Sequence, residues 1–117
     1  MSIQNEILNA IASRRSCRAY KPEQITAEEL EAVTTAGTWA ATAMGRQSPV
    51  MVAVQDKETL AELSRLNAAV MGTQNDPFYG APTAVLVLGE KNNPNGVQDA
   101  SLVMGNCLLY TSDAADE

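Results

Sequence analysis

The chain opens with an apolar stripe at helical spacing and then changes to an extended pattern. The stripe predicts a helix over residues 2–13. Its members are Ile3, Ile7, Ala10 and Ile11. In residues 17–20, apolar side chains alternate with polar neighbours, which predicts an extended exit from this helix. Pro22 follows and prevents any helix from continuing.

Two further helices carry recognisable start signals. Thr26 and Glu29 form a capping box that predicts a helix over residues 27–36, and Gly37 is suited to end it. Asp56 is a good N-cap for the next helix. The predicted core stripe of that helix is Leu60, Leu63, Leu66 and Val70.

Two continuous apolar runs of strand length, residues 49–54 and 83–88, lie between the helices. Runs of this kind are typical of strands buried on both faces. Residues 72–81 and 89–96 are rich in Gly, Asn, Asp and Pro, and they predict loops. A fourth helix is expected to begin at Val97. Helices around two apolar strands predict an α+β fold.

Residues 39–45 consist mainly of small side chains and predict a loop. Small side chains permit close approach of the backbone to a flat ligand or to a partner chain. A tightly packed turn would have the same composition, so the pattern alone leaves both interpretations open.

Composition excludes several classes of protein. The 117 residues suffice for one small domain, and no apolar run is long enough to span a membrane. The chain has no His, so Ser-His and Cys-His catalysis is excluded within it, and Cys17 and Cys107 make neither a disulfide framework nor a zinc site. The net charge of −6 argues against nonspecific nucleic-acid binding, and we expect a cytoplasmic location.

Three of the eight basic residues lie within residues 13–20, at Arg14, Arg15 and Arg18. A cluster of guanidinium groups in an acidic chain suits an anion, because the planar fork of Arg forms paired hydrogen bonds with phosphate. Solvated arginines that end a helix, where the macrodipole favours positive charge, are the alternative.

The order of these segments resembles the N-terminal half of the nitroreductase family of FMN-dependent oxidoreductases, over residues 3–106. The resemblance rests on Arg-Arg-Ser-x-Arg-x-Tyr after a short helix, the capping box at Thr26, and Arg46-Gln47-Ser48-Pro49 before an apolar strand. It implies the fold of that family, with helices around a central, mostly antiparallel sheet. It also implies a homodimer with two FMN sites at the interface and the fourth helix at the dimer's centre.

The resemblance also implies a cofactor site. Arg14, Arg15, Ser16 and Arg18 would hold the FMN phosphate, ribityl chain and nearby ring edge, and Asn67 would lie near the polar edge of the ring. An ordinary Asn near a helix C-terminus explains Asn67 equally well. A second group would reach the FMN of the other subunit: Ala41, Thr42, Ala43, Arg46 and Gln47. Family members often have Pro-Ser-x-x-Asn where this chain has residues 41–45, which puts the side-chain contacts of that group in doubt.

The implied reaction passes a hydride from NADH or NADPH through FMN to a nitroaromatic or quinone acceptor. Met44, Phe78 and Tyr79 are candidates for the acceptor side, although such residues often serve packing alone. Two other functions remain open. One is a non-catalytic phosphate- or nucleotide-binding module that uses residues 14–18, and the other is a specialised flavin enzyme, such as a dehalogenase or a flavin-destroying enzyme.

Residues 107–117 resemble the in-frame translation of a transposase adapter used in DNA library preparation. A natural helix end with an acidic tail is the alternative. The adapter interpretation makes residues 1–106 the N-terminal part of a single nitroreductase domain, cut off inside the fourth helix. We expect such a fragment to associate, to bind FMN weakly or not at all, and to show little activity, because its strands would have unpaired edges.

Overall fold

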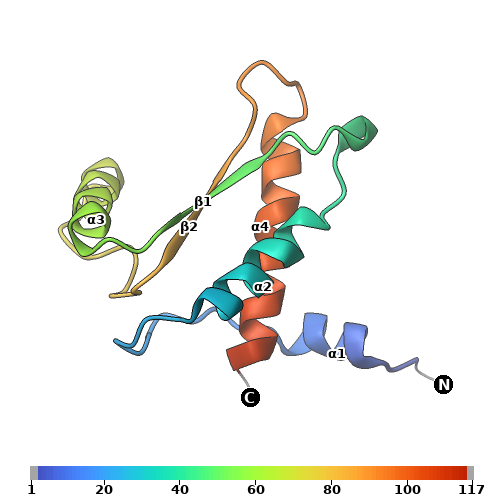
Figure 1. The fold of residues 1–117 in the computed structure, drawn as a ribbon, viewed down its shortest axis with the longest axis horizontal. Helices are drawn as coiled ribbons and strands as arrows, with labels where there is room; N and C mark the ends of the chain where they lie inside the picture. Colours follow the sequence, from blue (N-terminus) through green and yellow to red (C-terminus); the bar gives the residue numbers. More distant parts are fainter. Residues whose placement is uncertain (1–2, 116–117) are drawn as a thin grey trace.

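The computed structural model describes residues 3–115 of the chain. Figure 1 shows how its helices and strands are arranged. In chain order the elements are α1 (Glu6–Ser13), α2 (Ala27–Thr38), the 3-10 turn η1 (Ala43–Gly45), β1 (Val50–Val54), α3 (Lys57–Met71), β2 (Ala84–Leu88) and α4 (Gly96–Ala115). The helices and strands therefore follow the predicted order.

Helix α1 begins at Glu6, later than the predicted start at residue 2, which lies outside the described residues. The reason is local, because the Asn5 side chain accepts a hydrogen bond of 2.9 Å from the Leu8 amide and acts as N-cap. Ile3 therefore precedes the helix instead of joining its stripe. The predicted start was wrong because a suitable cap lay inside the periodic pattern.

Helix α2 confirms the predicted capping box. The Glu29 amide donates to Thr26 Oγ1 over 3.0 Å, and the Thr26 amide donates to Glu29 Oε1 over 2.8 Å. Gly37 does not end the helix, which continues to Thr38, and it is buried. A Cβ at Gly37 would lie 2.7 Å from Met51 Sδ and 2.9 Å from Cys107 Sγ. Gly37 thus permits close packing of α2 against β1 and α4.

Strands β1 and β2 form an antiparallel pair, in register from Val50 opposite Leu88 to Val54 opposite Ala84. Helix α4 packs against β2 and α2. Val50 and Val52 are exposed, so the expectation that both strands are buried on both faces is wrong for β1 in the described structure. The described helices cover too little of this two-stranded sheet to bury both of its faces.

Helix α3 stands beside the strands at the left of Figure 1. The Asp56 side chain caps it by accepting from the Thr59 amide over 3.0 Å, as predicted, and Gly72 ends it in the left-handed conformation. Leu60 and Ala68 are buried, whereas Val70 is 89% exposed. Leu66 is also exposed. The predicted core stripe is therefore wrong at Leu66 and Val70, because little of the described chain packs on that part of α3.

Helix α4 continues without a break past Asn106, where the sequence interpretation placed the end of the natural chain. Cys107 is buried, with its Sγ 3.5 Å from the Val33 carbonyl oxygen and 3.9 Å from Met51 Sδ. Burial raises the pKa of the Cys107 thiol. The origin of residues 107–117 stays a prediction. No helix among the described residues is long and apolar enough to cross a membrane.

Candidate functional site

The arginine segment, residues 14–20, begins where α1 ends. The Arg14 amide still donates to the Ala10 carbonyl over 3.1 Å, but its backbone has turned to ψ 136°. All residues from Arg14 to Tyr20 are exposed. As predicted, a short helix is followed by a basic, extended segment, and this segment is exposed to solvent.

The three arginines differ in what they contact. Arg15 Nη1 donates to the carbonyl oxygens of Ala12, over 3.1 Å, and of Arg14, over 2.8 Å. Arg15 therefore serves as a cap for the C-terminus of α1, the role that the alternative interpretation gave to these arginines. Arg14 and Arg18 are exposed on either side of it, with the Ser16 hydroxyl between them in sequence.

The end of the arginine segment is folded onto itself. Cys17 Sγ donates to the Ala19 carbonyl over 3.0 Å, and the Tyr20 hydroxyl donates to the Cys17 carbonyl over 3.0 Å. Partial burial is the main cause that raises the pKa of Tyr20, and Coulombic effects of Cys17 and Tyr79 add to it. Tyr79 is therefore close enough to act on Tyr20.

A second contact ties the following residues to the chain just before β2. Gln24 Nε2 donates to the Pro82 carbonyl over 2.8 Å, and the Thr83 hydroxyl donates to Gln24 Oε1. These hydrogen bonds join segments that are 58 and 59 residues apart in sequence. They hold residues 72–81 beside the end of the arginine segment.

Residues 72–81 have a defined shape set by Asp76. Its Oδ1 accepts from Ser64 Oγ over 2.7 Å and from the Phe78 amide over 2.9 Å, and its Oδ2 accepts from the Gly80 amide over 2.7 Å. These hydrogen bonds lower the pKa of Asp76, with that from Ser64 the largest cause. Tyr79 has a φ of 53° and is exposed, while Phe78 is half-buried.

The second predicted group, residues 41–47, surrounds η1 at the top of Figure 1, whereas α1 lies at the bottom. The Gln47 amide donates to Thr42 Oγ1 over 2.9 Å, and the Ala43 amide donates to Asp99 Oδ1 over 3.0 Å. Met44 is 88% exposed. Sequence reasoning missed Asp99, although a lone acid in the small, apolar start of the fourth helix was a usable signal.

Within one chain the predicted site residues do not converge. Asn67 lies on α3, far from α1 and from η1 in Figure 1, and its Nδ2 donates to the Leu63 carbonyl over 2.8 Å. That contact fits the ordinary helical asparagine left open above. Arg14–Arg18 form one group and Ala41–Gln47 another, and the fold holds them apart.

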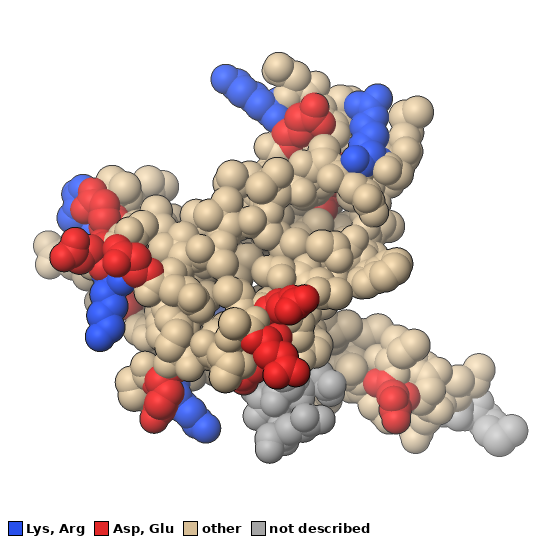
Figure 2. All heavy atoms as spheres, in the orientation of Figure 1, with Lys and Arg blue, Asp and Glu red and all other residues tan. Residues whose placement is uncertain are grey.

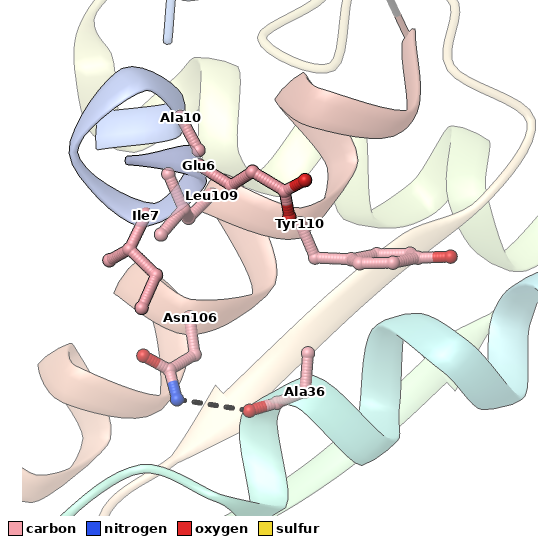
Figure 3. Close-up of a pocket in the computed structure, with 7 residues that line it drawn as sticks. All are labelled: Glu6, Ile7, Ala10, Ala36, Asn106, Leu109 and Tyr110. Carbon is pink, nitrogen blue, oxygen red and sulfur yellow. Dashed lines mark hydrogen bonds between the residues drawn. The ribbon is translucent and has the colours of Figure 1, made fainter. Parts of the chain in front are cut away.

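Two hollows of the surface lie elsewhere. A groove of about 380 Å³ runs between α1, α2 and α4, and Asn106 Nδ2 donates to the Ala36 carbonyl over 3.0 Å on its floor (Figure 3). Ile7, Leu109 and Tyr110 also line it. A second hollow of about 510 Å³ adjoins α3 and Asp76. Neither hollow is lined by a predicted cofactor residue.

On the face shown in Figure 2, the basic side chains stand at the edges, and acidic side chains gather just below the centre. Among the described residues, no three His, Cys, Asp or Glu side chains could together hold a metal ion. Arg14, Arg18 and Arg46 carry exposed guanidinium groups that could take an anion.

The model of the nitroreductase family matches residues 11–115. The chain belongs to the nitroreductase family. No curated protein sequence is significantly similar to this nitroreductase chain.

Solved structures of nitroreductases share the fold. A nitroreductase with bound FMN from Bacteroides fragilis is 28% identical, with a TM-score of 0.83 over 95% of this chain. One with bound FMN from Desulfitobacterium hafniense is 26% identical, with a TM-score of 0.83 over 96% of this chain. An FMN-dependent nitroreductase from Clostridium difficile is 26% identical, with a TM-score of 0.80 over 92% of this chain. The predicted nitroreductase-like α+β fold is confirmed.

This nitroreductase chain spans only part of those proteins. It covers 66% of the Bacteroides chain, 67% of the Desulfitobacterium chain and 56% of the Clostridium chain.

Proposed function

We propose that the protein is an FMN-dependent oxidoreductase that takes a hydride from NADH or NADPH and reduces nitroaromatic or quinone-type acceptors. The observation that carries this proposal is the match of the nitroreductase family to residues 11–115. Similarity to two FMN-bound nitroreductases supports the choice of cofactor. When bound, the flavin would supply the hydride and electron chemistry, and the protein would bind, orient and shield it.

The chemistry of the arginine segment fits the phosphate of FMN. Arg14 and Arg18 present exposed guanidinium groups from an extended backbone, and Ser16 adds a hydroxyl donor. Such groups bind a phosphate monoester through charge-assisted hydrogen bonds. Arg15, which donates to carbonyls at the end of α1, fixes where the segment begins.

The neighbouring loop suits the acceptor side of the same site. Tyr79 lies near Tyr20 at the end of the arginine segment, and Asp76 holds the backbone of Phe78 and Gly80 in place. Aromatic side chains on a braced loop can cover a flat ring and exclude water. We assign Phe78 and Tyr79 this role, and Met44 the same role from a second chain.

Two chains would complete the site as a homodimer. The support is geometric, because residues 41–47 lie at the top of Figure 1 and the arginine segment at the bottom, apart from one another in one chain. In a two-fold dimer, residues 41–47 of one chain would lie at the arginine segment of its partner. Arg46 and Gln47 would then contact the flavin of the partner chain.

Titrations with FMN, riboflavin and ADP test the cofactor. We expect the chain to bind FMN weakly and riboflavin at least about tenfold more weakly, because riboflavin lacks the phosphate that the arginines hold. Equal binding of FMN and riboflavin would contradict the proposal. If ADP binds as tightly as FMN, a non-catalytic phosphate-binding module is the better assignment.

A further inference from the structure

Asp99 is the described polar side chain that the fold buries most deeply, with 2% of its surface exposed. It lies in the first turn of α4, where the helix macrodipole favours an acidic side chain. Its Oδ1 accepts from the Ala43 amide over 3.0 Å. Its Oδ2 is buried and has no hydrogen-bond partner among the described residues. A buried carboxylate oxygen without a hydrogen-bond partner lowers stability, so Asp99 needs an explanation other than stability.

The segment that Asp99 holds has an unfavourable backbone. Met44, Gly45 and Gln47 have φ values of 56°, 64° and 52°. Residues other than glycine rarely adopt this left-handed region. Backbone of this kind persists only where its surroundings impose it. The exposed Met44 side chain offers little packing to do so.

Among the described residues, few side-chain hydrogen bonds impose this shape. The Thr42 hydroxyl accepts from the Gln47 amide within the segment itself. The Ala43–Asp99 hydrogen bond joins the segment to α4, 56 residues away in sequence. Asn93 Nδ2 donates to Ser48 Oγ over 3.4 Å just after the segment. Asp99 on α4 is thus a buried anchor for Ala43, the first residue of η1.

We propose that Asp99 is a positioning residue that fixes residues 42–47 in their strained shape through the Ala43 amide. This inference rests on the proposed function in one respect, because residues 42–47 include those that would contact FMN. Asp99 itself would not touch the cofactor. The required property is a buried acceptor at the position of Oδ1, which the amide oxygen of asparagine also supplies.

Limited trypsin digestion tests the anchor directly, because Arg46 lies within the held segment. We expect Asp99→Ala to speed cleavage after Arg46 about fivefold or more, since local opening controls proteolysis and one hydrogen bond is lost. Cleavage after Arg18 should keep the wild-type rate, because that residue is exposed in a distant segment. Ser101→Ala, which changes an exposed side chain on the same helix, is the matched control.

Asp99→Asn separates the acceptor from the charge. It should keep the wild-type rate of cleavage after Arg46. If Asp99→Ala leaves that rate unchanged, or if Asp99→Asn raises it as much as alanine does, the proposal is overturned. Faster cleavage after Arg65 in α3 would also overturn it, because Asp99 would then support the whole fold and not one segment.

Hydrogen exchange on the unaltered chain gives a second test that needs no variant to fold. The Ala43 amide should exchange about tenfold or more slowly than its intrinsic rate, because it donates to a buried acceptor. Exchange at the intrinsic rate would overturn the proposal.

Added FMN distinguishes this proposal from the proposed function. If FMN slows cleavage after Arg46 in the wild type and in Asp99→Asn but not in Asp99→Ala, both stand. If FMN changes no cleavage rate while Asp99→Ala alone exposes Arg46, the positioning role stands and the cofactor contact of residues 42–47 fails.

Discussion

Single side chains that bond to backbone amides set the ends of the helices and the shape of the loops. Asn5, Thr26 and Asp56 start α1, α2 and α3, and Asp76 shapes the loop that carries Phe78 and Tyr79. Each of these side chains satisfies an amide that a helix or turn leaves open. The same chemistry is used at Asp99, where the amide belongs to a distant segment.

The N-cap of α3 makes stability depend on pH. Hydrogen bonds from Thr59, first from its hydroxyl and then from its amide, lower the pKa of Asp56 below its unfolded value. The unfolded chain therefore binds more protons, and the stability contributed by Asp56 is lost as pH falls below about 4. We expect urea midpoints between pH 6 and pH 3 to fall less steeply in Asp56→Asn, which caps but does not titrate.

Thr59→Val is the matched comparison, because it removes the hydroxyl donor and keeps Asp56. Its pH dependence should lie between those of the wild type and Asp56→Asn. Identical pH dependence in all three proteins would show that this cap does not contribute to acid sensitivity.

At the scale of elements, the sequence predicted the features that depend on residues close together along the chain. The capping box of α2 and the N-cap of α3 were predictable because each depends on residues three apart. The exposure of Val70 on α3 and of Val50 and Val52 on β1 was not predictable, because it depends on what packs there. Gly37 shows the limit most clearly, since its role is set by Met51 and Cys107.

Substitution of Gly37 tests the packing of α2 against β1 and α4. Alanine is the better helix former, but its Cβ would meet Met51 Sδ and Cys107 Sγ at less than van der Waals distance. We expect Gly37→Ala to lower the free energy of unfolding by about 1–3 kcal/mol, as overpacking typically does. Gly105→Ala, where a Cβ meets nothing within 4 Å, should be neutral or stabilising in the same urea titration. A stable Gly37→Ala variant would mean that α2 is more loosely packed than described.

At the scale of the whole molecule, much apolar surface remains open. In the described structure, β1 and β2 pair only with one another, so each has an outer edge. Large apolar side chains on α4, among them Leu102 and Leu108, are also exposed. Unpaired edges and apolar faces favour association between chains.

Sedimentation velocity tests the homodimer that we propose. We expect the weight-average mass to rise with concentration, and Leu102→Lys on α4 to reduce that rise, because the resemblance puts this helix at the dimer's centre. Val70→Lys on α3 adds the same charge at an exposed apolar position and should leave association unchanged. If the protein stays monomeric at all concentrations up to about 100 µM, its association is too weak for a stable interface, and the homodimer is contradicted.

The candidate site was only partly predictable for a related reason. The arginine segment was readable because its residues are contiguous and its exposure follows from the end of a short helix. The link between residues 42–47 and Asp99 was not, because it joins residues 56 apart in sequence. The Coulombic effect of Tyr79 on the pKa of Tyr20 likewise depends on how residues 72–81 fold back.

We propose that Arg14 and Arg18 hold the phosphate of FMN. The most direct test is the dissociation constant of FMN, measured by flavin fluorescence for the wild type and for the double variant Arg14→Gln, Arg18→Gln. Arg65→Gln is the matched control, because Arg65 pairs with Glu62 on α3 away from the arginine segment. We predict at least about tenfold weaker binding for the double variant and an unchanged constant for Arg65→Gln. Equal affinity of the double variant and the wild type would contradict the account.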